Sequence, residues 1–99
     1  MTKVLLTLHC ASADAEVIGE ALRGISTAPI HLREETVLGT DFGDAGAGEQ
    51  VTARLRRTAL EILCEDALID DLIGAAGKAR RRLPFRWNAI AIHASGRMP

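Results

Sequence analysis

The sequence predicts a ferredoxin-like α+β fold with the order βαββαβ, in which a four-stranded antiparallel sheet carries two helices on one face. Three observations predict this fold. Four segments have the apolar or alternating pattern of strands, and two segments, which follow the first and third strands, place apolar residues at helical spacing. A Gly/Asp-rich segment, 39–53, separates the second and third strands and is long for a link between neighbours, so we expect a working loop there.

The first half of the chain is predicted to form a strand, a helix and a second strand. Lys3–Cys10 is rich in strand-forming residues and alternates between two faces. Ser12 and Asp14 can cap a helix over Val17–Ile25, whose apolar residues recur on one side. Ile30–Leu38 then has the alternating polar residues of a strand with one exposed face.

The second half repeats the pattern after the glycine-rich segment. Arg54–Cys64 is the third predicted strand, and Asp66 places a carboxylate at the start of a helix whose buried stripe runs over Leu68–Ala79. Pro84 separates this helix from the fourth strand, Trp87–Ala94. The 99 residues are expected to form one domain, 1–99.

Composition excludes several classes of function. The sequence is 47% apolar but has only three aromatic residues, which disfavours nucleic-acid binding by base stacking. The net charge of −1 gives no general attraction to DNA or membranes, yet residues 1–49 hold 3 basic and 8 acidic side chains whereas residues 50–99 hold 9 and 5. The acidic half and the basic half could therefore meet across a subunit interface.

The cellular location is predicted from the cysteines and the N-terminal segment. The two cysteines lie far apart, without CxxC spacing, so we expect a reduced, cytoplasmic protein with both thiols buried as small apolar side chains. Thr7 and His9 interrupt the apolar N-terminal run, which is read as a strand rather than a signal peptide, and no segment is long enough for direct membrane insertion.

The sheet face opposite the helices is predicted to be apolar enough to drive self-association. Ile90 and Ile92 are expected to point toward the helices. The residues expected on the opposite face are Leu5, Thr7, His9, Ala59, Leu63, Ala89 and Ala91.

Three arginines at the start of the third strand, Arg54, Arg56 and Arg57, are candidates for binding an anion, because guanidinium groups hold phosphate or carboxylate through paired hydrogen bonds. We expect Arg56 to face away from the other two. The alternative is a solvated face, or salt bridges to nearby carboxylates: Glu34, Glu35 or Glu49.

Three histidines, His9, His31 and His93, each lie near the end of a predicted strand and are candidate metal ligands. Imidazole suits Zn²⁺ or Cu⁺, and a trimer could bring three copies of one histidine together. No two of them have metal-ligand spacing, so ordinary hydrogen-bonded histidines are the alternative.

Four features resemble the PII-like superfamily, trimeric ferredoxin-like regulators that include nitrogen-signalling PII and divalent-cation tolerance proteins. They are segment 39–53, the sequence EQVTARLRR at Glu49–Arg57, IDDL at Ile69–Leu72, and the Trp87 strand ending in Gly96 and Arg97. The sequence is most similar to the PII-like group often encoded beside heavy-metal efflux pumps.

The resemblance implies a homotrimer that binds an anion, a nucleotide or a metal near its subunit clefts and signals through segment 39–53 to a partner such as a membrane transporter. Glu49, Gln50 and Arg97 join the three arginines as candidate ligand-binding residues.

The sequence also departs from the best-known PII proteins. It has no tyrosine, which rules out control by uridylylation, and its one Gly-Lys pair, Gly77 and Lys78, lies within the predicted second helix rather than in a phosphate-binding loop, which argues against a nucleotide. We expect no enzyme, because no catalytic triad spacing is present. The rivals are a small enzyme with His9 or His31 as base, and an assembly partner without a ligand.

Overall fold

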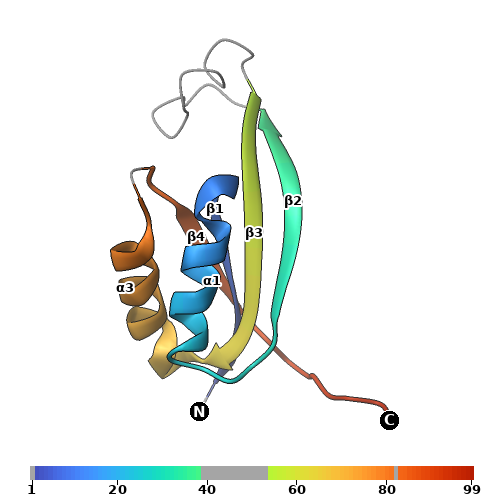
Figure 1. The fold of residues 1–99 in the computed structure, drawn as a ribbon. Helices are drawn as coiled ribbons and strands as arrows, with labels where there is room; N and C mark the ends of the chain where they lie inside the picture. Colours follow the sequence, from blue (N-terminus) through green and yellow to red (C-terminus); the bar gives the residue numbers. More distant parts are fainter. Residues whose placement is uncertain (1, 39–53, 82) are drawn as a thin grey trace.

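The computed structural model describes residues 2–38, 54–81 and 83–99, and it confirms the predicted βαββαβ fold (Figure 1). Two short 3-10 turns, Ser12–Asp14 and Asp66–Leu68, precede the helices. The helices and strands are β1 (Lys3–Ala11), α1 (Ala15–Arg23), β2 (Ile30–Leu38), β3 (Arg54–Glu65), α3 (Ile69–Ala79) and β4 (Arg86–Ala91). The predicted loop from Gly39 to Ala53 lies outside the described residues.

The four strands form one antiparallel sheet in the order β2-β3-β1-β4. Both helices lie on the same face, packed beside each other, and β2 lies at the side of the sheet away from them (Figure 1). We call the opposite face the open face. Within the described residues, neither helix has the length and apolarity that crossing a bilayer requires.

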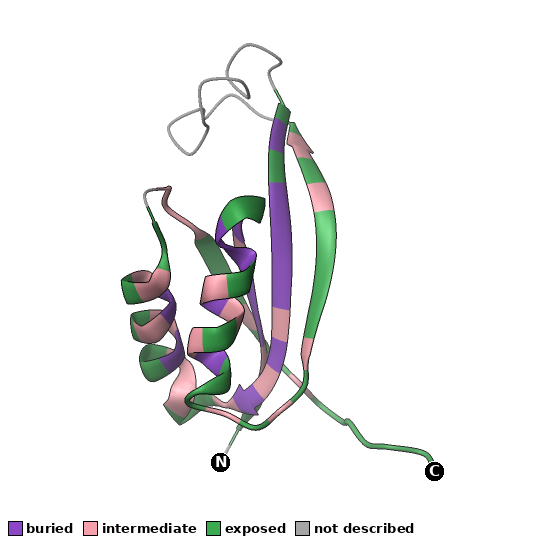
Figure 2. Cartoon of the chain, in the orientation of Figure 1, coloured by how far each residue is buried: buried purple, intermediate pink, exposed green. Residues whose placement is uncertain are grey.

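The core lies between the helices and the three strands they cover. Alternation along β1 sends every second side chain to this core, and the helices add the apolar stripes that their spacing predicted (Figure 2). Full burial of one such side chain contributes about 1.5–3 kcal/mol. The fully buried large side chains are Leu6, Leu8, Ile18, Leu22, Leu60, Ile62 and Leu72.

The ends of two elements differ from the prediction. The N-cap of α1 is Asp14, which makes no side-chain capping hydrogen bond, and the Ser12 hydroxyl instead accepts a hydrogen bond from the Thr58 hydroxyl at 3.0 Å. β4 ends at Ala91 rather than Ala94 because its partner β1 begins at Lys3, whose carbonyl accepts one last hydrogen bond from the Ile92 N–H.

The predicted facing of β4 is wrong. Residues directly opposite each other in an antiparallel pair point to the same face. Ala89 lies opposite Leu6 of the core, so Ala89 and Ala91 face the helices, whereas Ile90 lies opposite Leu5 on the open face and is 60% exposed. The pairing register with β1 decides this, and the apolar run of β4 does not reveal it.

The open face is more polar than predicted. Leu5 and Leu63 do lie on it as expected. Two ion pairs lie among them, one between His9 Nδ1 and Glu35 Oε1 and one between Arg33 Nη1 and Glu61 Oε1. The open face therefore mixes apolar side chains with polar and charged side chains that already pair with each other.

Candidate functional site

The arginine-rich end of the sheet is the candidate site. β2 ends and β3 begins here, and the antiparallel register places Leu38 opposite Arg54 and Glu35 opposite Arg57. The two strands lead directly to and from segment 39–53. Two cavities lie at this end, and both are lined by Glu35, Thr36 and Arg57.

The three arginines divide between the two faces of the sheet, but not as predicted. Arg56 lies opposite Thr36 and, two residues away, Arg54 shares its face, on the helix side of the sheet. Arg57 lies alone of the three on the open face. The prediction that Arg56 faces away from Arg54 and Arg57 is wrong. Side chains alternate along a strand, so Arg54 and Arg56 share one face and Arg57 lies on the other.

Arg57 is 4% exposed, although arginine is seldom buried without partners. Its Nη1 donates a hydrogen bond to the Arg56 carbonyl oxygen at 2.9 Å, and it lies directly opposite Glu35. A guanidinium removed from water must retain hydrogen bonds or charge partners to remain stable. Arg57 is therefore held in a fixed position between the two cavities.

The first cavity, of about 430 Å³, opens on the side of Ser12 and the end of β1. The hydrogen bond from Thr58 fixes the Ser12 hydroxyl at its edge. Guanidinium and hydroxyl groups together form the donor set that binds carboxylate or phosphate oxygens. The residues that line the first cavity are Ser12, Glu34, Glu35, Thr36, Arg56 and Arg57.

The second cavity, of about 290 Å³, lies on the open face. His9 and Arg86 form one side of it, and they lie opposite each other in the β1–β4 pair. Because His9 Nδ1 bonds to Glu35, this imidazole is oriented by a carboxylate. The remaining lining residues are Thr36, Val37, Leu55 and Arg57.

The other predicted site residues are not brought to this end of the sheet. Glu49 and Gln50 lie outside the described residues. Arg97 and His93 belong to the exposed C-terminal segment, which leaves the sheet at the end remote from the β2–β3 junction (Figure 1). His31 is exposed on the open face opposite Glu61.

The arrangement of the candidate ligand side chains does not support a metal site within one chain. In the parts of the chain that the structure covers, no three histidine, cysteine or acidic side chains gather closely enough to hold an ion. The three histidines remain predicted ligands only if copies of the chain bring them together.

The two cysteines lie in the core, as predicted. Burial, and secondarily the negative charge of Asp14, raise the pKa of the Cys10 thiol to about 11. Burial likewise raises the pKa of Cys64, and the nearby Glu65 adds to this. Both thiols are therefore protonated at neutral pH and are poor nucleophiles or metal ligands.

Sequence reasoning missed Ser12 and Arg86 as members of this site. Ser12 was expected only as a helix cap, and Arg86 lies one residue before the predicted fourth strand. The register between β1 and β4 places Arg86 opposite His9. Extending the predicted strand by one residue would have brought Arg86 to the same end of the sheet.

The sequence matches no protein-family model and no functionally curated protein. Solved structures do resemble the fold. A DUF3240 family protein from Shewanella baltica OS155 superposes with a TM-score of 0.79 at 17% identity, over 100% of this chain and 99% of that one.

Two further structures have similar folds. The PII protein of Arabidopsis thaliana bound to citrate gives a TM-score of 0.69 at 8% identity, over 92% of this chain and 78% of that one. A Bacillus cereus protein related to NIF3 gives 0.70 at 14% identity, over 97% of this chain but only 26% of that one. At these identities the likeness shows the fold alone, and the chain has the PII-like fold.

Proposed function

We propose that this protein is a small, non-enzymatic regulator of the PII-like kind that binds a multivalent organic anion at the β2–β3 junction. The observation that carries the proposal is the buried Arg57, which borders two cavities where the strands lead into segment 39–53. A ligand there contacts both strands, so its binding can bias the conformation of the segment between them.

The first cavity is the better anion site of the two. Arg56 is exposed on one side and Arg57 is buried on the other, with the Ser12 hydroxyl at the edge. Glu34 and Glu35 also line it, so a single small anion would meet both attraction and repulsion. An anion with several carboxylates and at least one hydroxyl fits this mixed set best, because its groups can face the arginines while its hydroxyl donates to a glutamate.

Citrate is the natural first probe. It is a tricarboxylate with one hydroxyl, and the PII structure from Arabidopsis thaliana was solved bound to it. Fixing backbone conformation costs about 1–2 kcal/mol per residue, so a ligand that acts on a neighbouring segment needs several contacts. A multivalent anion meets that requirement better than chloride or acetate.

The assembly and the partner are parts of the same proposal. The resemblance to PII-like proteins favours a homotrimer, with the open faces turned inward and the anion sites near subunit clefts. The partner would be a transport component in the membrane, such as a metal-efflux pump, that recognises segment 39–53 in its ligand-bound form. This protein would act in the cytoplasm.

Thermal-shift and calorimetric titration with citrate tests the anion site, with acetate, ATP and Zn²⁺ for comparison. We expect citrate to raise the melting temperature and acetate to leave it unchanged. Arg56→Ala should weaken citrate binding by about 10- to 100-fold, because one charge-assisted contact is worth about 1.5–3 kcal/mol. Arg23→Ala is the matched control, since Arg23 is an exposed arginine on α1.

The outcome separates the alternatives. If Arg56→Ala binds citrate as tightly as the unmodified protein, the anion site is not at this cavity. Stabilisation by Zn²⁺ alone would favour the histidine site, and no response to any compound would favour an assembly partner without a ligand.

A further inference from the structure

A groove of about 730 Å³ lies between α1 and β2, beside the two cavities at the β2–β3 junction. The two helices cover the other strands, whereas the helix side of β2 has no helix over it (Figure 1). One apolar wall of the domain is therefore left uncovered.

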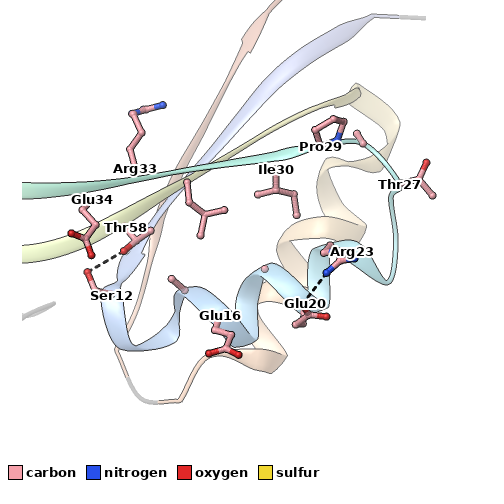
Figure 3. A pocket seen from close by; sticks show the side chains of 14 residues that line it. Ser12, Glu16, Glu20, Arg23, Thr27, Pro29, Ile30, Arg33, Glu34 and Thr58 are labelled. Carbon is pink, nitrogen blue, oxygen red and sulfur yellow. Dashed lines mark hydrogen bonds and ion pairs between the residues drawn. The ribbon is translucent and has the colours of Figure 1, made fainter.

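The floor of the groove is apolar. Ile30 points from β2 toward α1 (Figure 3), and Leu32, two residues on, shares its face and is 56% exposed. On the α1 side, Ala15 and Gly19 lie one helical turn apart and line the groove with little side-chain bulk. An exposed leucine beside a groove of this size is a feature of interaction surfaces.

The rim of the groove is acidic. Glu16 and Glu20 line it from α1, and Glu34 lines it from β2 (Figure 3). Arg23 partly offsets them, but its Nη1 is bonded to Glu20 at 3.1 Å. The Arg33 side chain points away from α1 (Figure 3) and pairs with Glu61 on the open face, so it adds no positive charge to the groove.

The dimensions fit one helix. α1 has 9 residues and so is about 14 Å long. β2 has 9 residues and is about 30 Å long. A helix of three turns packed about 8–10 Å from α1 would cover Ile30 and Leu32 as α1 covers the neighbouring strands.

We propose that the α1–β2 groove binds an amphipathic helix of a partner protein, with lysines or arginines on both sides of its apolar stripe. The stripe packs on Ile30 and Leu32, and the flanking cations face the glutamates of the rim. Charge complementarity selects a basic helix over an acidic one. The proposal is independent of anion binding, although Ser12 and Glu34 border both the groove and the first anion cavity.

The test uses the full chain without added anion and a labelled synthetic peptide of fourteen residues. The peptide has leucines at helical spacing (i, i+3, i+4, i+7) and lysines elsewhere; a matched peptide has glutamate in place of each lysine. By fluorescence anisotropy, we expect the lysine peptide to bind at least tenfold more tightly than the glutamate peptide. Leu32→Asp should abolish the binding.

Charge-reversal variants separate the groove from the general charge of the protein. The double variant Glu16→Lys with Glu20→Lys should weaken binding of the lysine peptide at least tenfold. The double variant Asp70→Lys with Asp71→Lys makes the same change of charge in the first turn of α3. It should change the affinity for the lysine peptide less than twofold. All four positions are exposed, so circular dichroism should show an unchanged fold.

Three results would overturn the proposal: no binding of the lysine peptide, full binding to Leu32→Asp, or equal losses in the two charge-reversed proteins. If sedimentation shows self-association that Leu32→Asp abolishes, the groove binds a second copy instead of a partner helix.

Discussion

At the scale of single residues, Arg57 combines two properties that usually exclude each other. It is nearly inaccessible to solvent, as a structural residue is, and it borders two cavities, as a binding residue does. Arg56, its neighbour, is exposed on the other face of the sheet. Adjacent arginines on one strand thus have different environments, and their substitution has different consequences.

We predict that Arg57→Ala destabilises the fold whereas Arg56→Ala does not. Removal of the Arg57 side chain breaks its hydrogen bond to the Arg56 carbonyl and leaves the space of a buried side chain unfilled, which should lower the free energy of unfolding by about 1–3 kcal/mol. Exposed Arg56 should change it by less than about 0.5 kcal/mol. Urea denaturation of both variants measures the difference. Equal midpoints would show that Arg57 contributes little to the fold.

At the scale of elements, periodicity predicted the helices and strands because each has one face in the core. The alternation of Val4, Leu6 and Leu8 and the helical spacing of Ile18 and Leu22 correspond to buried positions. β4 was different: its residues Ala89, Ile90 and Ala91 are all apolar, so alternation could not show which face each occupies. Only the hydrogen-bonded register with β1 determines that.

The candidate site was predictable only in part for the same reason. Arg54, Arg56 and Arg57 stand out in the sequence as a cluster of charge. Ser12 and Arg86 approach them only in the folded sheet: Ala11, next to Ser12, lies opposite Arg57, 46 positions away, and Arg86 lies opposite His9, 77 positions away. Contacts over such separations depend on the topology of the whole sheet, which a local pattern does not encode.

Helix α3 contains two glycines, Gly74 and Gly77, without an evident packing role. A Cβ atom built at Gly74 meets no atom within 4 Å. We predict that Gly74→Ala raises the free energy of unfolding by about 0.5–1 kcal/mol, because alanine loses less backbone entropy in a helix. Thermal and urea denaturation measure it. Gly24→Ala is the comparison, since a Cβ there meets the Ala21 carbonyl oxygen at 3.4 Å and should gain less. A destabilised Gly74→Ala protein would contradict the prediction.

At the scale of the whole molecule, the two faces of the sheet differ in what covers them. On the helix side, the core side chains of β1 and β3 are buried under the helices, and a groove remains between α1 and β2. The open face carries the His9–Glu35 and Arg33–Glu61 pairs beside apolar side chains that include Leu5, Leu63 and Ile90. Paired charges on a flat surface can be buried between subunits at lower cost than single charges. This composition is compatible with the predicted homotrimer in which open faces turn inward.

Ile90 is the position that best tests this assembly. It lies on the open face and is 60% exposed in the single chain. If the open faces meet, Ile90→Glu buries a carboxylate without a partner, which costs several kcal/mol per subunit and should dissociate the trimer into folded monomers. Ala89 cannot serve this purpose, because it faces the helices and its replacement by glutamate would disturb the core.

Sedimentation velocity measures the mass of each form. We expect the unmodified protein at three times the chain mass of 10.6 kDa, and Ile90→Glu at the mass of one chain. The control is Ile25→Glu, which places the same charge at an exposed isoleucine just beyond α1, away from the open face, and should leave the trimer intact. A monomeric unmodified protein, or a trimer that withstands Ile90→Glu, would contradict the inward-facing arrangement. Loss of the trimer in both variants would instead indicate an interface that includes the helices.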